Sequence, residues 1–566
     1  METKSCQNCK KDFVIEQDDF LFYEKIKVPP PTFCPECRLQ RRLVWMKGLD
    51  LFKRKCDLCG EVKISMYHPD APYVVYCTKC WWGDGWDPAD YSMEYDSNRT
   101  FFEQWNELYH KTPVFGLSTD KITTELSPYT NHVGNSKHSY LIFYSYLVED
   151  SAYGFEITNS KNIYNCGTIL NSENCFDSSN VYKSYNIVSS SGNTRSCYDC
   201  FFIRDCEGCH HCFGLSNGKN QSYVFLGEQL TKEKYEESVN NIDMGSYSQY
   251  LQWKEKVINY FKTISPKPVW ETLSQNISGS YIFNSKNCHN CFDVTDCEDS
   301  KFLMLIKIGK VKDSYDYTDW GENVELLYEC MTVGDQAQNV KFSHDCGHGI
   351  SNIEYSKLST GSSYNFGCIS IKKSDYCILN KKYSKEEYFE LRKKIIKDMD
   401  INPYRSIEGH TYKYGEFLPP EFSPHSYNDS FASRVFPLTI DTVISKGLKW
   451  YGGEKKEYRV TIQTVDIPDN TAEVDETILN EVLQCGTCVR GFKIISQELQ
   501  FLQQHHLPLP RQCPFCRVWE KVDKCVDNMK QVERNCDKCG INFITHYSKE
   551  EALKIFCKEC YKKEFL

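Results

Sequence analysis

The sequence lacks any long hydrophobic run. No stretch reaches the roughly 18 consecutive apolar residues that mark a membrane-spanning helix. The opening Met1-Glu2-Thr3-Lys4-Ser5-Cys6 also lacks the apolar region of a secretory signal. These two absences predict a cytoplasmic protein without membrane association.

The motifs of common enzyme classes are also missing. The chain has no His-Glu-x2-His, no glycine-rich phosphate loop ending in Lys and no Gly-x-Ser-x-Gly. Acidic pairs such as Asp205 with Glu207, or Asp296 with Glu298, have the composition of a glycosidase site. Polysaccharide-cleaving β-helices, however, are typically secreted and have much longer turns. We therefore expect a non-enzymatic protein without a small-molecule cofactor, and a β-solenoid enzyme ranks a distant third among its possible functions.

Positive charge is scarce except at the two ends. The 566 residues carry a net charge of −10, whereas residues 1–80 and residues 481–566 each carry +3. The middle of the chain therefore carries −16, which disfavours contact with a phosphate backbone there. If the protein binds nucleic acid, we expect the two ends of the chain to make the contacts.

Cysteine, by contrast, is abundant, with 31 residues. Sixteen of them form eight Cys-x2-Cys pairs, in one cluster of four pairs at each end. From first cysteine to first cysteine, the steps are 28, 22 and 21 residues in one cluster and 28, 23 and 21 in the other. The chain therefore carries one four-pair module twice. The pairs are Cys6/Cys9, Cys34/Cys37, Cys56/Cys59, Cys77/Cys80, Cys485/Cys488, Cys513/Cys516, Cys536/Cys539 and Cys557/Cys560.

These pairs have the pattern of zinc sites. Two Cys-x2-Cys turns supply the four tetrahedral thiolates of a closed structural zinc site. In each module 24 residues separate the first and second pairs and 17 separate the third and fourth, near known zinc spacings. Gly60 and Gly540 directly follow a pair, where the turn needs a positive φ. We predict four zinc ions, two per module.

Two alternatives concern these cysteines. Disulfides are typical of short secreted chains, so we favour zinc for a chain of this length. Within a module, the first pair joins either the second (sequential pairing) or the third (cross-braced pairing). The spacing does not decide between them, although we favour sequential pairing.

The middle of the chain has a second repeat. An aromatic residue follows a short polar tripeptide again and again, from Tyr140 to Tyr198 and from Phe302 to Tyr376, and most steps are 11 to 14 residues. Such a short period predicts a narrow β-solenoid whose turns have two strands and two corners. The spacing Cys197-x2-Cys200-x5-Cys206 recurs from Cys288, which indicates two solenoid arms.

Helices are expected after each arm. Ser384 and Glu387 form a capping-box pattern that opens a helix to about Met399. Residues 231–263 read as one or two helices. Both would cap the solenoid, because an open end exposes strand edges.

The predicted fold class is mainly β, with small α+β zinc modules of zinc-ribbon or treble-clef type flanking a two-armed narrow β-solenoid with helical caps. The expected domains are an N-terminal double-zinc module (1–90), a connector packing on the solenoid (91–134), arm 1 (135–230), a helical insertion (231–270), arm 2 (271–382), a capping helix (383–400), an extended linker (401–480) and a C-terminal double-zinc module (481–566).

Several motifs resemble those of one known family. They include Cys34-Pro35-Glu36-Cys37-Arg38, Cys56-Asp57-Leu58-Cys59, Trp86-Asp87-Pro88 and Phe101-Phe102-Glu103-Gln104. Over nearly its whole length the chain resembles multi-zinc-ribbon proteins found mainly in ultra-small, reduced-genome bacteria of the candidate phyla. The resemblance implies zinc binding and a cytoplasmic location, and no activity. In the second module, Arg517-Val518-Trp519-Glu520-Lys521 departs from the arginine row of the first.

A basic stretch follows the second cysteine pair. Arg38, Arg41 and Arg42 fall on one face if residues 38–47 form a helix, with aromatic residues nearby. Guanidinium groups on a rigid helix suit phosphate contact and base stacking. The competing interpretation is a solvated face paired with local acids. The candidate nucleic-acid contacts are Arg38, Arg41, Arg42, Lys53, Arg54 and Lys55.

The favoured partner is accordingly RNA, DNA or a ribonucleoprotein, bound through the N-terminal module. The alternative is a protein–protein interaction scaffold with purely structural zinc. The aromatic run from Trp81 to Trp105 is expected to be core packing rather than a binding surface. The cysteines between Cys197 and Cys212 either stack as ladders in the solenoid core, which we favour, or hold a fifth metal ion.

Overall fold

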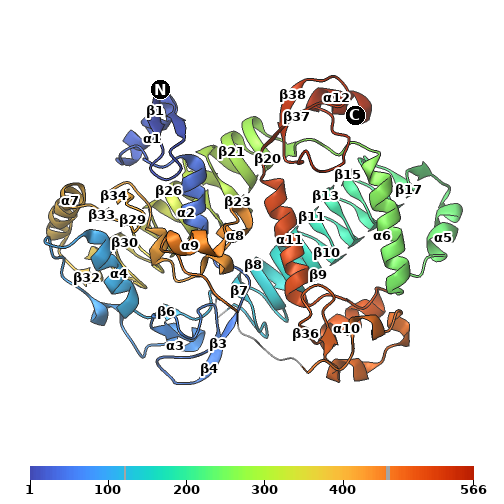
Figure 1. Cartoon of the computed structure of the whole chain (residues 1–566), viewed down its shortest axis with the longest axis horizontal. Coiled ribbons are helices and arrows are strands. Elements are labelled where there is room, and N and C mark those ends of the chain that lie inside the picture. Colours follow the sequence, from blue (N-terminus) through green and yellow to red (C-terminus); the bar gives the residue numbers. More distant parts are fainter. Residues whose placement is uncertain (120–122, 454–458, 566) are drawn as a thin grey trace. The chain divides into compact units, whose positions relative to one another are not determined.

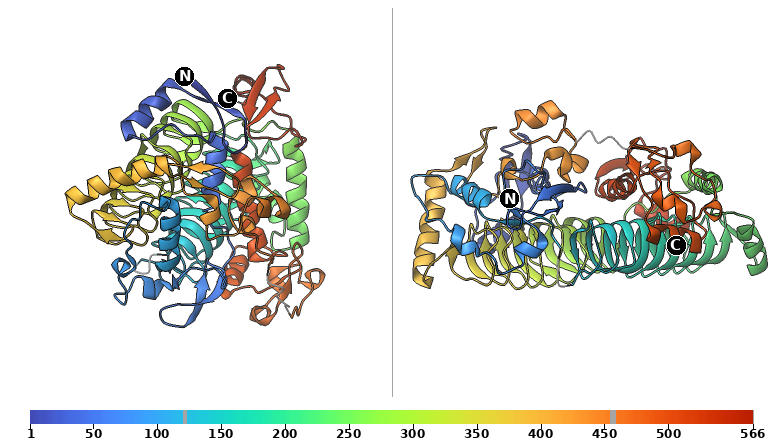
Figure 2. Two further views of the ribbon diagram at one scale, coloured as in Figure 1. Left: turned by 60° about the vertical axis from the view of Figure 1, so that its left-hand side comes forward. Right: turned by 90° about the horizontal axis from the view of Figure 1, so that it is seen from below.

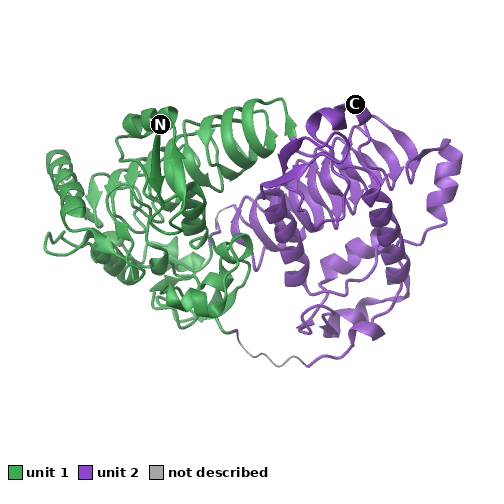
Figure 3. Cartoon of the chain, turned by 45° about the horizontal axis from the view of Figure 1, so that its top comes forward, with its two compact units in different colours: residues 1–117, 271–452 green, residues 118–270, 453–566 purple. Residues whose placement is uncertain are grey.

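The computed structural model describes residues 1–119, 123–453 and 459–565, and the chain divides into two compact units. Unit 1 comprises residues 1–117 and 271–452, and unit 2 comprises residues 118–270 and 453–566 (Figure 3). Each unit therefore combines one end of the chain with one of the two repeat regions. The N-terminal module shares a unit with the second repeat region, and the C-terminal module shares a unit with the first.

Unit 2 contains a 12-stranded, mainly parallel sheet, which we call the unit 2 coil (Figure 2). Cys175 lies opposite Ile187 on the neighbouring parallel strand, and Ile187 lies opposite Cys200 on the next. Residues 12 or 13 positions apart in the sequence are therefore neighbours in the sheet. The strands are β7 (Asn131–Gly134), β8 (Tyr140–Glu149), β9 (Ala152–Leu170), β10 (Glu173–Phe176), β11 (Ser179–Tyr182), β12 (Tyr185–Val188), β13 (Ser191–Arg195), β14 (Tyr198–Phe201), β15 (Arg204–Glu207), β16 (His210–Phe213), β17 (Ser222–Phe225) and β18 (Glu228–Gln229).

The backbone of this coil has a period of three residues. Every third residue from His132 to Ser189 has a positive φ, although none of them is glycine. Asn tolerates this left-handed conformation better than most residues, which explains why it recurs along the segment. Each 12-residue step therefore contains four bends, not the two corners per turn expected from the aromatic spacing.

A narrow core follows from the same period. The residue after each left-handed position points inward, and Ile163, Cys166 and Ile169 illustrate this spacing. The core contains mainly Ile, Val and Cys, together with serines that are buried beside it. Small and β-branched side chains fit because only three residues separate successive bends.

Unit 1 contains the corresponding 14-stranded sheet, the unit 1 coil, with register steps of 11 to 14 residues. Its strands are β19 (Glu271–Thr272), β20 (Gln275–Phe283), β21 (Lys286–Thr295), β22 (Cys297–Lys301), β23 (Met304–Ile306), β24 (Val311–Lys312), β25 (Tyr315–Thr318), β26 (Val324–Val333), β27 (Gln338–Lys341), β28 (His344–Cys346), β29 (Ser351–Glu354), β30 (Ser363–Phe366), β31 (Cys377–Ile378) and β32 (Lys381–Lys382).

The predicted helices after the repeat regions are confirmed. Helices α5 (Lys232–Asn240) and α6 (Tyr247–Lys262) follow the unit 2 coil. Helix α7 (Lys385–Ile401) follows the unit 1 coil, and Ser384 and Glu387 form the expected capping box. Helix α5 contacts β17 and helix α7 contacts β31, which are strands close to the last of each sheet.

The segment predicted as an extended linker, 401–480, contains short elements in both units. In unit 1 these are β33 (Tyr404–Arg405), β34 (Thr411–Tyr412), α8 (Ala432–Val435), α9 (Ile440–Ser445) and the 3-10 helices η2 (Pro420–Phe422) and η3 (Tyr427–Asp429). In unit 2 they are η4 (Thr464–Asp466), η5 (Thr471–Glu473) and η6 (Glu476–Asn480). Residues 454–458 of the predicted linker lie outside the described ranges.

The two cysteine modules consist of short hairpins and helices (Figure 1). The first, with the segment that follows it, has β1 (Glu2–Ser5), β2 (Asp12–Ile15), α1 (Gln17–Ile26), α2 (Pro35–Leu43), β3 (Phe52–Lys55), β4 (Val62–Ser65), β5 (Val75–Tyr76), α3 (Thr78–Trp81), η1 (Pro88–Tyr91), α4 (Phe101–Lys111) and β6 (Val114–Phe115). The second has β35 (Leu483–Gln484), β36 (Gly491–Phe492), α10 (Ser496–Gln504), α11 (Pro514–Asn528), β37 (Val532–Asn535), β38 (Asn542–Thr545) and α12 (Lys558–Phe565). Among the described residues, no helix combines the length and apolarity required to cross a bilayer.

Candidate metal centres

The sixteen paired cysteines form four clusters. Within each cluster the four sulfur atoms lie within 4.8 Å of one another. The first pair of each module joins the second and the third joins the fourth, so the favoured sequential pairing is confirmed. The clusters are Cys6/Cys9/Cys34/Cys37, Cys56/Cys59/Cys77/Cys80, Cys485/Cys488/Cys513/Cys516 and Cys536/Cys539/Cys557/Cys560.

The sulfur spacing fits a tetrahedral metal ion. The Cys9 and Cys34 sulfurs lie 3.7 Å apart, and the Cys485 and Cys516 sulfurs lie 3.9 Å apart. Zinc–sulfur bonds of about 2.3 Å in a tetrahedron place two sulfurs about 3.8 Å apart. A disulfide would require about 2.05 Å. All 31 cysteines lie in the described ranges and are free thiols.

Every cluster combines a hairpin turn with a helix start. One cysteine pair lies in the turn between β1 and β2, β3 and β4, β35 and β36, or β37 and β38. The other pair lies at the start of α2, α3, α11 or α12. Pro35 and Pro514 occupy the first turn of their helices, where proline's missing N–H costs nothing.

The hairpin turns need a left-handed residue directly after the cysteine pair. Gly60 and Gly540, with φ of 75° and 76°, meet this need as expected. Lys10 and Val489 take the same conformation without being glycine, with φ of 61° and 59°. In all four turns this residue donates its N–H to the carbonyl of the first cysteine.

Backbone N–H groups favour the thiolate form, which is the form that binds metal. In each cluster the backbone N–H of the third cysteine donates to the sulfur of the first, at 3.1 to 3.2 Å. Burial opposes ionisation, but these and neighbouring N–H groups lower the pKa of Cys56 and Cys485 to about 7. The same groups lower the pKa of Cys536 to about 6. A cluster of four cysteines that contains such a thiol is a fitting ligand set for a divalent metal ion.

The arginine row on α2 lies inside unit 1. Arg38, Arg41 and Arg42 are at most 4% exposed. They do share one face of a helix, as expected, but that face packs on strands β25 and β26 of the coil (Figure 1). The prediction that these three side chains contact nucleic acid is therefore wrong, because solvent and ligands do not reach them.

The row forms a buried ion network. Asp316 lies 2.9 Å from Arg38 Nη2 and 3.0 Å from Arg42 Nη1. Arg41 binds two acids. Its Nη2 lies 2.6 Å from Glu329, and its Nη1 lies 2.9 Å from Glu416. Both Asp316 and Glu329 are fully buried side chains on the coil. Such a network is costly to break, because each partner left behind is a buried charge.

Helix α11 docks on the unit 2 coil with different residues. Arg517 stands where the first module has Arg38, and it binds Glu498 of α10 at 2.6 Å and Asn165 of β9 at 2.7 Å. Lys521 stands where the first module has Arg42, and it pairs with Asp177 of the coil. Burial alone would raise the pKa of Asp177, but the ammonium groups of Lys254 and Lys521 hold it well below its usual range.

The second basic stretch, residues 53–55, contains one buried arginine and two exposed lysines. Arg54 is 9% exposed and donates to the carbonyl oxygens of His68, Ala71 and Tyr73 at 2.6 to 3.1 Å. It closes the loop before the fourth cysteine pair, so its predicted role in nucleic-acid contact is also wrong. Lys53 and Lys55 on strand β3 are exposed.

The other two motifs are largely structural. Trp81, Phe101, Phe102 and Trp105 are buried at 1% exposure or less, as core packing requires, whereas Trp82 of the same run is 39% exposed. The inward thiols near Cys197 donate to carbonyl oxygens two residues earlier, at 3.3 to 3.5 Å, which is the ladder arrangement that we favoured. The inward cysteines in this run are Cys197, Cys200, Cys206, Cys209 and Cys212.

The sequence interpretation missed the carboxylates that receive the docking helices. Asp316, Glu329 and Asp177 lie in the repeat regions, far along the chain from the cations they bind. The only available signal was the surplus negative charge of the middle of the chain. That surplus does not indicate which acids lie inside the protein.

Comparisons with known proteins add little. No protein-family model matches the chain, and no curated protein matches it. Among solved structures it is weakly similar to UDP-N-acetylglucosamine acyltransferase from Campylobacter jejuni, at 10% identity and a TM-score of 0.08, over 53% of this chain and 97% of that one. A similarity at this level supports no argument. The resemblance to multi-zinc-ribbon proteins stays a prediction.

Proposed function

We propose that this chain is a zinc-dependent, non-enzymatic binding protein whose four metal sites are structural. One observation carries the proposal. In each unit the helix that starts at the second cysteine pair inserts its cations among acceptors of the coil. The metal sites thereby hold a docking helix in place. Four thiolates in tetrahedral spacing are typical of structural zinc and leave no open position for a substrate.

We further infer that each coil is one arm of a β-solenoid. The parallel register, with steps of 11 to 14 residues, supports this, as does the left-handed residue at every third position of the unit 2 coil. Helices α5 and α7 would cap the arms, because they contact strands close to the last of each sheet. A solenoid of this kind presents long, regular faces, which suit the binding of an extended macromolecule.

The residues of each module have separate tasks. The cysteines bind the ion, and its binding energy counts as folding energy for a module too small to fold on its own core. Arg54 and Arg534 close the loops before the last cysteine pairs by donating to backbone carbonyl oxygens. The cations of α2 and α11 then attach the folded module to its coil.

Metal analysis tests the proposal directly. Purified, reduced protein should contain about four zinc ions per chain. Cys34→Ser should lower the zinc content by about one ion, because Cys34 belongs to a cluster. Cys209→Ser is the matched control, since this buried thiol bonds to a carbonyl oxygen in the core, and it should leave the content unchanged. Equal zinc content in both variants would contradict the proposal.

Nucleic-acid binding through the N-terminal module is the second candidate, and Lys53 and Lys55 would now carry it. One observation favours it. The equivalent positions in the second module are Glu533 and Asn535, so a basic face of this hairpin is confined to the first. The arginine between these positions, Arg54 or Arg534, is kept in both modules and donates to backbone carbonyl oxygens in each. The lysines therefore vary independently of the fold.

A binding assay separates nucleic acid from the alternative of a protein-interaction scaffold. Lys53→Glu combined with Lys55→Glu should abolish a salt-sensitive gel shift of RNA or DNA. The control, Lys562→Glu with Lys563→Glu, makes the same charge change on α12. No shift by the unaltered protein at low salt would favour the protein scaffold.

A further inference from the structure

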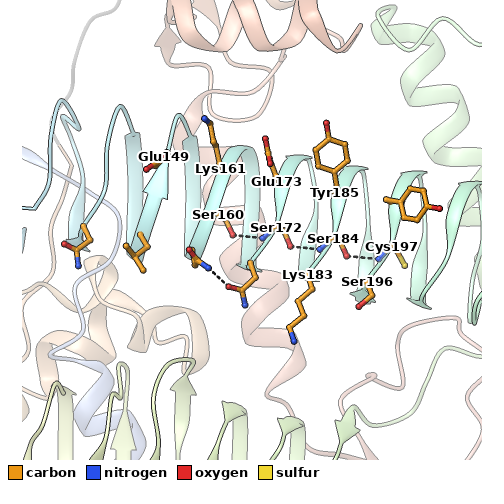
Figure 4. A pocket seen from close by; sticks show the side chains of 15 residues that line it. Glu149, Ser160, Lys161, Ser172, Glu173, Lys183, Ser184, Tyr185, Ser196 and Cys197 are labelled. Carbon is orange, nitrogen blue, oxygen red and sulfur yellow. Dashed lines mark hydrogen bonds between the residues drawn. The ribbon is translucent and has the colours of Figure 1, made fainter.

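A groove of about 750 Å³ runs along the unit 2 coil, across its strands (Figure 4). Its two sides and its floor are columns of residues that repeat at the coil's 12- or 13-residue step. Asn159, Asn171 and Lys183 belong to one side, and Lys161 and Tyr185 belong to the other. The groove thus offers similar groups at intervals of one strand spacing, about 4.8 Å.

The floor of the groove is held rigid by a series of serine hydrogen bonds. Ser160, Ser172 and Ser184 are buried there. Each hydroxyl accepts, at 3.1 Å, the backbone N–H of the next floor residue along the coil. Each also donates to a carbonyl oxygen two residues earlier, at 2.8 to 2.9 Å. With both bonding roles used, these hydroxyls are poor nucleophiles, so the serines stiffen the floor rather than react.

The charges of the groove cancel. Glu149 and Glu173 both pair in register with Lys161, which lies on the strand segment between them. Lys183 on the opposite side makes the total two glutamates and two lysines. A polyanion gains nothing from a neutral groove with exposed glutamates, and this disfavours nucleic acid at this site.

Aromatic and amide groups provide the remaining lining. Tyr185 and Tyr198 are neighbours in register and are 48% and 42% exposed. Tyr198 stacks on His210, with ring centroids 4.7 Å apart and an interplanar angle of 6°. Asn159 donates to Asn171 Oδ1 at 2.6 Å, and this bond does not use the amide hydrogens of Asn171. The groove therefore presents ring surfaces together with uncharged donors and acceptors.

A peptide strand is a poor occupant. Strands β10, β12 and β14 each pair with a neighbour on both sides, so they offer no open edge to an added strand. A ligand must instead bind to side chains. A sugar chain matches this chemistry, because its hydroxyls bond to Asn, Glu and Lys and its ring C–H faces pack on tyrosine.

We propose that this groove binds an uncharged polysaccharide, with successive sugars lying across successive strands. The proposal rests on the proposed function of a non-enzymatic binding protein and names its ligand class. The tyrosines are contact residues for the sugar rings, and Asn171 is a hydrogen-bond donor to its hydroxyls.

Calorimetric titration of the full-length, zinc-loaded protein tests this proposal. The probes are two neutral oligosaccharides, cellohexaose and mannohexaose, with hexagalacturonate and poly(dT) as anionic comparisons. We expect binding of at least one neutral probe, weakened about tenfold by Tyr185→Ala with Tyr198→Ala. Asn171→Ala should weaken it about fivefold. Tyr129→Ala, which removes a tyrosine of similar exposure outside the groove lining, should leave binding unchanged.

The outcomes separate this proposal from the proposed function. The altered residues are exposed, so each variant should keep the zinc content of the unaltered protein. A zinc content of the unaltered protein far from four ions per chain would count against structural zinc. The sugar titration would still test the polysaccharide proposal independently. Failure of both neutral probes, binding of the anionic probes alone, or equal affinity in the groove variants would overturn the polysaccharide proposal.

Discussion

The two docking helices have the same origin and different partners. Helices α2 and α11 both start at the second cysteine pair of a module, and both use a basic residue one turn and two turns later. In both units an acid of the coil takes part, Asp316 in unit 1 and Asp177 in unit 2. The acid outside the coil differs, because it is Glu416 in unit 1 and Glu498 of the module itself in unit 2. The cysteines therefore set the fold of the module, and the charges after them set where it docks.

This comparison explains the departure of the second module. Where the first has Arg41, the second has Glu520, which lies 3.2 Å from Lys524 on the same helix. Arg41 needs Glu329 and Glu416 beside it, and these residues belong to unit 1. Losing the central arginine is compatible with docking because Arg517 and Lys521 retain buried partners.

Removal of the metal should have the largest effect on both modules. Structural zinc contributes about 10–16 kcal/mol of apparent binding energy per ion, so stripped modules should unfold. We expect limited proteolysis after chelation to begin within residues 1–90 and 481–566. The coils, whose core cysteines belong to none of the four clusters, should resist longer. Identical cleavage maps with and without metal would contradict this difference.

Breaking the ion network that attaches α2 to the unit 1 coil should have the next largest effect. Asp316→Ala removes a carboxylate shared by Arg38 and Arg42 and leaves buried cations, at a cost of about 3–5 kcal/mol. Hydrogen exchange should then rise in α2 and β25. The matched control is Asp313→Ala, because Asp313 pairs with the half-exposed Lys25 and should contribute only about 0–1 kcal/mol. Equal costs for the two variants would show that burial of the network is not decisive.

The attachment of α11 to the unit 2 coil should weaken in acid. The folded-state pKa of Asp177 is depressed, so its contribution is present above the unfolded value of about 4 and is lost as pH falls through the folded value. The difference in urea midpoint between the unaltered protein and Asp177→Asn should therefore shrink below pH 4. Asp150→Asn, on an exposed part of the same coil, provides the reference. A difference that stays constant down to pH 2 would exclude this ionisation.

Much of the metal site was predictable from the sequence, and the docking was not. Cysteine spacing predicted all four clusters, since ligands close in sequence constrain each other through short turns. Gly60 and Gly540 gave the turn conformation, but Lys10 and Val489 adopt it without a sequence signal. The helix capped by Ser384 and Glu387 was likewise predictable, because a capping box is a local pattern.

The repeat region was predictable only in part. The aromatic spacing gave the step of about 12 residues that the strand register confirms, but it did not show that the bends follow a period of three. The inward positions alternate among Ser, Cys, Ile and Val, as in Ser160, Ile163 and Cys166, so hydrophobicity alone hides the shorter period. The basic row misled for a different reason. The local sequence does not distinguish a solvated arginine from a buried one. The acids that pair with these arginines in the interior lie more than 270 residues away along the chain.

The smallest predicted effect concerns the fit of α11 against the unit 2 coil. A Cβ placed on Gly167 would lie 2.8 Å from Lys521 Cβ, closer than two carbon atoms approach without displacement. Gly167→Ala should therefore push α11 outward and cost about 1–3 kcal/mol. Gly452→Ala, where a Cβ meets nothing within 4 Å, is the control and should not destabilise the fold. Because Lys521 pairs with Asp177, a displaced α11 should also reduce the acid sensitivity of this attachment. A Gly167→Ala protein with unchanged stability would mean that α11 does not pack on β9 as closely as this geometry requires.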